Sequence, residues 1–148
     1  MVTVDRSALV EHPAPRMFAL VEDIEAYPRF LPWCSGVDIV SREPGRTVAT
    51  LHVLYHGIRQ KFTTENRNTL GESIEIRLVS GPFRHLLGLW RFKALGDEAS
   101  KVSLHMEYQL SSALLAGVAG PVFGHIADTF VDAFVRRAHE LHPSRKDQ

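Results

Sequence analysis

The chain has 148 residues, and its 17 Lys and Arg balance its 17 Asp and Glu. Hydrophobic residues make up 45% of it and charged residues 23%, a composition that argues against disordered, collagen-like and disulfide-scaffold proteins. Zero net charge also argues against a typical non-specific nucleic-acid binder, although a local basic patch stays open. The one cysteine, Cys34, leaves no intramolecular disulfide.

One domain is predicted over residues 1–142, followed by a frayed tail over residues 143–148. The first residues lack a cationic start followed by an apolar run, so we expect neither a signal peptide nor a transit peptide, and a cytoplasmic protein. Residues 108–127 carry no formal charge. This stretch contains Gly117, Gly120 and Pro121 and begins inside a strand pattern, so no transmembrane segment is predicted.

Turn-forming residues divide the chain at hairpin spacing. Residues 2–10 are predicted to form a strand, which Pro13 and Pro15 end before two short helices that reach about Phe30. Six further strands are predicted over residues 37–42, 47–56, 58–69, 73–80, 85–95 and 101–110. In the last strand apolar and polar residues alternate, so one face of the sheet is expected to be buried.

A helical pattern follows over residues 113–141, where Gly117, Gly120 and Pro121 should bend the helix or divide off its first turn. Seven strands about 4.8 Å apart make a sheet roughly 34 Å wide. One helix is only about 10–12 Å across and cannot cover it. The sheet must therefore curl, leave a groove filled by side chains or a ligand, or bury the remainder against another subunit. A deep apolar cavity is the expected site.

The sequence contains no recognisable catalytic or metal-binding motif, and we predict no catalytic residue, no metal site and no required cofactor. His52 and His56 would lie roughly 13 Å apart along one strand, too far to share an ion. His125, Asp128 and Asp132 fit the solvated side of an amphipathic helix. Cys34 is interpreted as a small buried hydrophobe.

Basic residues concentrate in the central strands, where residues 58–93 hold seven Lys and Arg against three Glu. Arg59 with Lys61, and Arg91 with Lys93, alternate with apolar neighbours and should therefore share the outer face of the sheet. This face is interpreted either as an ordinary solvated surface or as a footprint for RNA phosphate or anionic lipid; the lipid alternative implies peripheral contact with a membrane.

The aromatic residues indicate where a ligand could bind. The segment from Tyr27 to Trp33 contains two prolines, which should keep it out of regular structure and expose large apolar groups at the lip of a pocket. In this hypothesis Leu31, Pro32 and Trp33 gate the entrance. The predicted ligand-binding residues are Tyr27, Phe30, Leu31, Pro32, Trp33, Phe83, Trp90, Phe123, Phe130 and Phe134.

Five short motifs in this order resemble the coenzyme Q-binding START-like family, within the polyketide cyclase and lipid transport superfamily. They are Tyr27-Pro28-x-Phe30-Leu31-Pro32-Trp33-Cys34, Phe62-Thr63-Thr64-x-Asn66, Leu78-Val79-x-Gly81-Pro82-Phe83, Trp90-x-Phe92 and Ala133-Phe134-x-x-Arg137-Ala138. The resemblance implies an α+β helix-grip fold, in which a curved seven-stranded antiparallel sheet wraps around a long C-terminal helix, with two short helices after the first strand.

Two roles attach to this family. Quinone-binding members hold ubiquinone and support respiration without catalysis, and Trp33 resembles them; a bacterial ribosome association toxin of the family binds the large ribosomal subunit. The first hypothesis is thus a non-enzymatic carrier of ubiquinone or a similar isoprenoid quinone. The alternative is a ribosome-binding regulator that uses the basic face, with or without an antitoxin partner. A third is a cyclase or aromatase, which would need polar acid/base groups facing the cavity; His52 or Arg84 deep in the cavity would support it.

Overall fold

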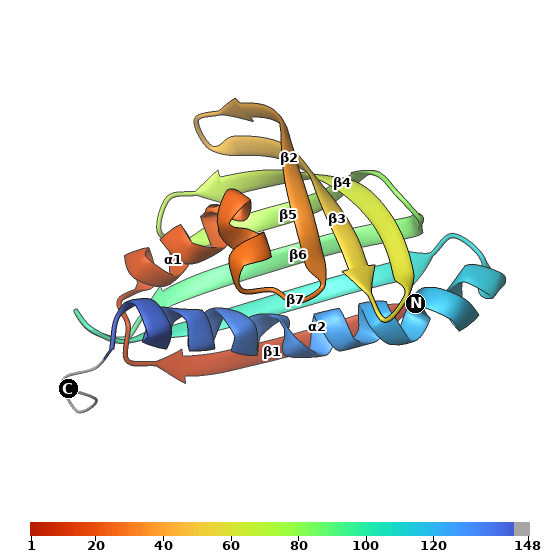
Figure 1. Cartoon of the computed structure of the whole chain (residues 1–148). Coiled ribbons are helices and arrows are strands. Elements are labelled where there is room, and N and C mark those ends of the chain that lie inside the picture. Colours follow the sequence, from red (N-terminus) through yellow and green to blue (C-terminus); the bar gives the residue numbers. More distant parts are fainter. Residues whose placement is uncertain (144–148) are drawn as a thin grey trace.

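The computed structural model describes residues 1–143, which form one curved antiparallel sheet, a long helix across its concave face and two short helices (Figure 1). The strand order is β1-β7-β6-β5-β4-β3-β2. The strands are β1 (Val2–Val10), β2 (Cys34–Glu43), β3 (Arg46–Tyr55), β4 (Ile58–Thr69), β5 (Ser73–Ser80), β6 (Phe83–Ala94) and β7 (Ser100–Leu110). The helices are α1 (Ala14–Glu22), the 3₁₀ helix η1 (Ile24–Arg29) and α2 (Ala113–Leu141). The predicted helix-grip architecture is confirmed.

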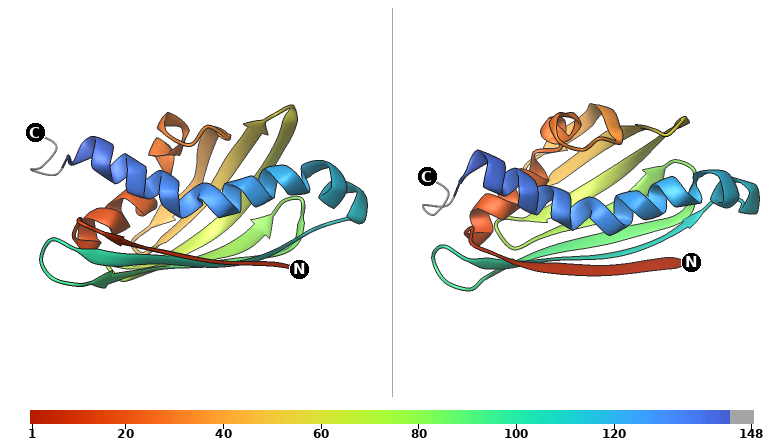
Figure 2. Two further views of the ribbon diagram at one scale, coloured as in Figure 1. Left: turned by 90° about the horizontal axis from the view of Figure 1, so that it is seen from below. Right: turned by 60° about the horizontal axis from the view of Figure 1, so that its bottom comes forward.

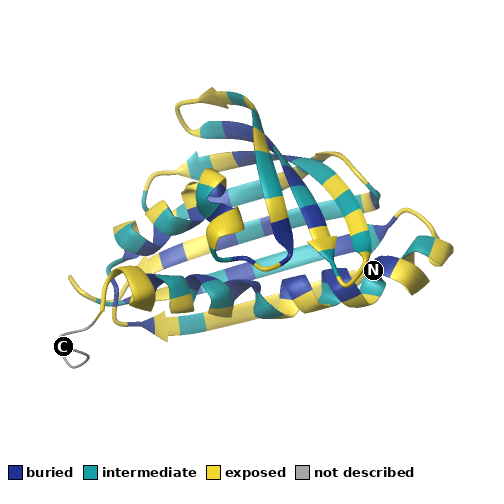
Figure 3. Cartoon of the chain, in the orientation of Figure 1, coloured by how far each residue is buried: buried dark blue, intermediate teal, exposed yellow. Residues whose placement is uncertain are grey.

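Alternating burial along the strands produces the two faces of the sheet, as Figure 3 shows. In β7, Val102, Leu104, Tyr108 and Leu110 are buried, as their period-two spacing predicts. Two strands begin earlier than predicted. Cys34 pairs with Val53 before a bulge in β2, and Phe83 pairs with Leu110 before a bulge in β6. Bulges of this kind could not be predicted from the sequence, because the extra residue has no fixed sequence pattern.

The helix α2 crosses the concave face as a single element of 29 residues, and its buried side contacts the sheet. Its first turn is capped by the Ser112 hydroxyl, which accepts a hydrogen bond from the Leu115 amide at 3.1 Å. Pro121 lies inside the helix without dividing it, although the axis bends near its N-terminal end (Figure 2). By length and composition α2 could cross a membrane; here it is the helix that the sheet grips.

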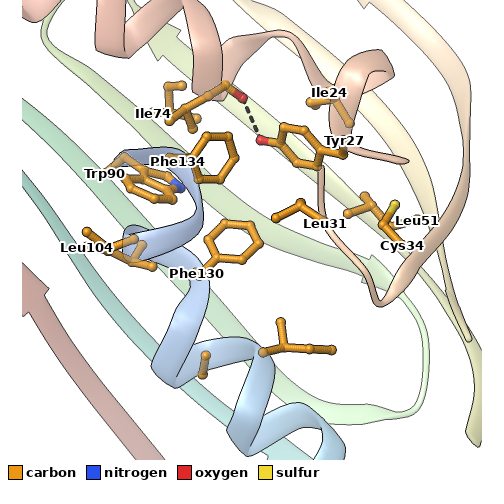
Figure 4. Close-up of a cluster of buried hydrophobic side chains, with 14 of the residues drawn as sticks. Ile24, Tyr27, Leu31, Cys34, Leu51, Ile74, Trp90, Leu104, Phe130 and Phe134 are labelled. Atoms are coloured by element: carbon orange, nitrogen blue, oxygen red, sulfur yellow. Dashed lines mark hydrogen bonds between the residues drawn. The ribbon is translucent and has the colours of Figure 1, made fainter. Parts of the chain in front are cut away.

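The core beneath α2 is a cluster of interlocking aromatic rings (Figure 4). Phe134 is fully buried, with its ring 5.3 Å from that of Tyr27 and 5.4 Å from that of Trp90. The Tyr27 hydroxyl donates a hydrogen bond to the Val21 carbonyl at 2.5 Å. Burial raises the pKa of Tyr27, which keeps its hydroxyl protonated as a donor. The rings therefore fix η1 against the middle of α2.

The segment from Tyr27 to Trp33 differs from its prediction. Pro28 lies inside η1, so the proline does not exclude the segment from regular structure. Tyr27, Leu31 and Trp33 are buried rather than exposed, at 5%, 1% and 3% of their accessible surface. Tyr27 and Trp33 pack against Phe130 of α2, so the segment supplies apolar side chains to the core there.

A cluster of histidines joins the end of α2 to the start of α1. The buried His12 has its Nε2 3.0 Å from Nδ1 of His139 and its Nδ1 3.2 Å from the guanidinium of Arg16. Arginine only donates, so Nδ1 of His12 accepts and Nε2 donates to His139, which makes His12 neutral. Burial lowers the pKa of His12, as do the nearby charges of His139, Arg16 and His142, while Glu11 acts in the opposite direction.

Candidate functional site

A mostly apolar cavity lies between the concave face of the sheet and α2. Its volume is about 80 Å³. A cavity needs roughly 10–15 Å³ on this measure for one water molecule, whereas sites for drug-sized ligands span about 300–1,000 Å³. Entry of a larger ligand would therefore require side chains to move. The wall is formed by Ile24, Tyr27, Trp33, Leu51, Phe62, Thr64, Asn66, Ile76, Phe83, Leu86, Met106, Tyr108, Phe123, Ile126, Ala127 and Phe130.

Five of the ten residues predicted to bind a ligand line this cavity, namely Tyr27, Trp33, Phe83, Phe123 and Phe130. Trp33 stacks on Phe130 with ring centres 5.8 Å apart, and Phe83 meets Phe123 edge to face at 5.0 Å. These contacts place aromatic walls at both ends of the cavity. The residues come from η1, the segment before β2, β6 and α2, so only the tertiary fold brings them together.

The other five predicted residues do not line the cavity. Trp90 and Phe134 are 0% exposed and belong to the packed core, because neighbouring rings fill the space on every side of them. Leu31 is buried in the same core. Phe30 is half-buried, with the guanidinium of Arg137 5.4 Å from its ring centre, and Pro32 is exposed to solvent. The predicted gate at residues 31–33 is therefore closed by packing.

Three polar groups on the cavity wall were not among the predicted ligand-binding residues. The Thr64 hydroxyl donates to Oδ1 of Asn66 at 3.2 Å, and both residues are buried on the inner face of β4. Within residues 1–143 the Asn66 amide nitrogen and the Tyr108 hydroxyl make no hydrogen bond, so both keep free donor capacity. Phe62, Thr64 and Asn66 are spaced two residues apart in β4, so their side chains share one face of the sheet. This spacing could have predicted that Thr64 and Asn66 face the cavity with Phe62.

The basic residues singled out from the sequence are exposed on the outer face of the sheet, as predicted. They form two separate clusters. Arg91 lies opposite Ser73, which lies opposite Thr69, at the far end of β4 from Arg59. Ten residues of strand, or roughly 33 Å, separate the two positions. The first cluster is Arg59 with Lys61, and the second is Arg91, Lys93 and Lys101.

The second cluster includes Lys101, which the sequence analysis did not select. In this cluster two positive charges face each other across neighbouring strands. Lys93 lies directly across from Lys101 in the register of β6 and β7. Within the described part of the chain none of the five basic side chains of the two clusters forms an ion pair. Arg67 and Arg77, by contrast, are paired with Glu65 and Glu75. Like charges in cross-strand pairs destabilise a sheet, so an anionic partner would relieve the repulsion.

Comparison with known proteins identifies the family of this chain and solved structures with the same fold. The family model described as polyketide cyclase/dehydrase and lipid transport matches residues 10–135. The chain belongs to this family. Among solved structures, a START superfamily protein from Mycobacterium smegmatis superposes with a TM-score of 0.80 at 21% identity, covering 94% of this chain and 98% of that one. This likeness concerns the fold.

Sequence comparison matches the chain to relatives whose names describe two different functions. The chain is 42% identical over 139 residues to the ribosome association toxin RatA of Pseudomonas aeruginosa, covering 94% of this chain and 96% of the relative. It is 25% identical over 149 residues to the mitochondrial coenzyme Q-binding protein COQ10 of Dictyostelium discoideum, covering 97% and 72%. The resemblance of Trp33 to quinone-binding members is therefore outweighed by the similarity of the whole chain to the toxin.

The two side chains that would support a cyclase lie outside the cavity. An aromatase/cyclase from Streptomyces superposes with a TM-score of 0.79 at 20% identity over 96% of each chain, which again concerns the fold. His52 lies on the outer face, 2.7 Å from Asp38, and Arg84 is exposed with its guanidinium 3.3 Å from the Ser111 carbonyl. Neither lines the cavity. The titratable groups on its wall are two tyrosines, and burial raises the pKa of Tyr108 as it does that of Tyr27.

The remaining candidates for chemistry occupy ordinary structural positions. Cys34 is buried, and burial raises the pKa of its thiol to about 11. On α2, Asp128 forms an ion pair with Arg6 of β1 at 2.9 Å, and the ring of His125 stacks on Tyr55 at 5.5 Å. No group of three potential metal ligands comes together among residues 1–143.

Proposed function

We propose that this protein associates with the bacterial ribosome, as the name of its RatA relatives says of them, and that it binds the large subunit. The observation that carries the proposal is the 42% identity to the Pseudomonas aeruginosa toxin over 94% of this chain. The matched region spans 94% of this chain, so it extends over both the sheet and α2.

The second basic cluster is the surface that we assign to this role. Arg91, Lys93 and Lys101 stand on adjacent strands without carboxylate partners among the described residues. Three such contacts to RNA phosphates release counterions, so affinity should fall by roughly 20-fold to 40-fold between 50 and 200 mM salt. Phosphate groups would also remove the repulsion between Lys93 and Lys101.

Cosedimentation with purified large subunits at low salt tests this proposal. The triple variant Arg91→Gln, Lys93→Gln, Lys101→Gln should lose binding, whereas a double variant at Arg59 and Lys61 should retain it. Absence of cosedimentation by the unmodified protein at low salt would overturn the proposal. Equal loss in both variants would instead mean that the assigned surface is wrong, because the effect would depend on overall charge alone.

We propose, as a second function, that the cavity holds an apolar ligand with a carbonyl group, such as ubiquinone or a similar isoprenoid quinone. The cavity between sheet and helix supports this proposal, because its wall is apolar apart from three polar residues. The free amide donor of Asn66 suits a quinone carbonyl, which only accepts hydrogen bonds. The apolar tail would gain affinity by burial at about 25 cal/mol per Å².

Organic extraction of protein purified from its native host, followed by mass spectrometry, tests this second function. A quinone near one per chain is the expected result. Phe123→Trp, which should fill the cavity, is expected to reduce the bound amount, and Lys93→Gln should leave it unchanged. An extract without quinone, or the same amount in the Phe123 variant, would contradict the placement.

A further inference from the structure

Four segments that are distant in the sequence meet at one end of the molecule, where α2 begins (Figures 1 and 2). They are the turn between β3 and β4, the turn between β5 and β6, the start of β1 and the first turns of α2. Contacts join them: Tyr55 stacks on His125, and the Arg84 guanidinium lies 3.3 Å from the Ser111 carbonyl. Phe62, Phe83 and Phe123, in mutual contact, form the nearest cavity wall.

Charged residues are distributed unevenly between the two ends of the molecule. Residues 1–4, 51–64, 78–86 and 108–127 of this end contain no Asp or Glu and contribute Arg59, Lys61 and Arg84. Two carboxylates border these segments, Asp38 beside His52 and Glu107 across from Thr3. The three turns at the opposite end of the sheet each contain or adjoin carboxylates, with Glu43, Glu72 and the pair at 97–98. The opposite end also holds Arg91, Lys93 and Lys101, so acidic and basic residues are mixed there. The zero net charge of the chain therefore conceals one end at which basic side chains predominate.

The same positive end carries exposed apolar side chains. Six of the eleven large hydrophobic residues exposed among residues 1–143 lie here, and these are Met1, Val2, Leu54, Val79, Leu114 and Val118. Leu114 and Val118 are 80% and 57% exposed and lie one helical turn apart. Only 39% of the most apolar 18-residue stretch of α2 is buried. Water-exposed apolar side chains grouped in this way indicate a docking surface.

We propose that this end, which we call the docking end, binds the surface of an anionic phospholipid bilayer. It comprises Arg59, Lys61, Arg84, Leu54, Val79, Leu114 and Val118. Basic side chains attract anionic head groups, and the uncharged first turns of α2 can enter the boundary between head groups and acyl chains. RNA would satisfy the cations but would leave the leucine and valine side chains without an apolar environment, so the combination favours lipid. Docking in this orientation brings the phenylalanine wall of the cavity to the bilayer.

Flotation of the full chain with vesicles tests the proposal. We expect binding to vesicles of phosphatidylcholine with one quarter phosphatidylglycerol and weaker binding to phosphatidylcholine alone. At about 1 kcal/mol for each basic residue, Arg59→Gln with Arg84→Gln should reduce partitioning by roughly 30-fold. Leu114→Asp with Val118→Asp should abolish it. These four residues are exposed, so the variants are expected to fold.

Matched controls lie at the other end and on the other cluster. Leu70→Asp replaces a side chain that is 87% exposed in the turn between β4 and β5, and it should bind vesicles normally. Arg91→Gln with Lys93→Gln removes two charges and should also bind normally. No flotation, equal loss in the controls, binding of RNA but not of vesicles through Arg59, or formation of dimers that depend on Leu114 would each overturn the proposal. Ribosome binding is measured separately by cosedimentation, so failure of ribosome binding and failure of bilayer docking can be distinguished.

Discussion

Phe134→Ala and Phe123→Ala should have different consequences, although both phenylalanines lie on the buried side of α2. Phe134 is 0% exposed, with ring centres at 5.2 Å from Phe30, 5.3 Å from Phe130 and 5.4 Å from Trp90. Truncating it opens a new void in a packed core, which costs about 4–5 kcal/mol, the upper part of the range for this substitution. Phe123 borders existing space, so its truncation should cost about 3 kcal/mol.

Thermal unfolding followed by circular dichroism measures this difference. For a chain of this size Phe134→Ala should lower Tm by roughly 8–20 °C, and Phe123→Ala by a smaller amount. Binding of an apolar fluorescent probe should increase only in Phe123→Ala, because that change enlarges the cavity. Equal losses of stability, or increased probe binding in Phe134→Ala, would refute the distinction between packed core and cavity wall.

Three further predictions concern a histidine, a glycine and the cysteine. Burial holds the pKa of His12 below its ordinary 6.5 in the folded protein, so the unfolded chain takes up the proton first. Stability is therefore complete above about pH 6.5 and lost as the pH falls below it, and urea titrations of His12→Gln should show a smaller loss. Gly81→Ala should cost about 1–3 kcal/mol in thermal unfolding, because Gly81 has φ +150° and a Cβ there would lie 2.6 Å from Cβ of Phe62. Gly57→Ala, in open space, should cost less; the reverse order would contradict the packing argument. Cys34, with a pKa of about 11, should react with a thiol reagent only after unfolding, and rapid labelling of the native protein would disprove its burial.

The predicted strands and the long helix agree with the structure because their signals are local. The alternation in β7 and the apolar stripe of α2 depend on the period of each element, which is a property of neighbouring residues. The cavity was likewise expected from widths alone, since one helix cannot cover seven strands. The outer-face position of Arg59 and Arg91 also follows from strand parity.

The identity of the cavity residues could not be obtained in this way. Trp90 and Phe123 both point inward, yet one is enclosed by rings and the other borders space, and only the packing of neighbours separates them. Tyr27 and Trp33 were expected at an exposed lip and are buried, because η1 folds back against α2. Asn66 was passed over because its importance depends on facing a cavity.

By itself, the sequence determined the element order, the buried and solvated faces and the family resemblance, since periodicity and motifs are written along the chain. Tertiary structure alone decided which inward side chains line the cavity and that the basic residues form two clusters about 33 Å apart. It also decided that exposed apolar side chains gather with Arg59, Lys61 and Arg84 at one end. These properties arise from the register of the strands and the curvature of the sheet, which join residues far apart in sequence.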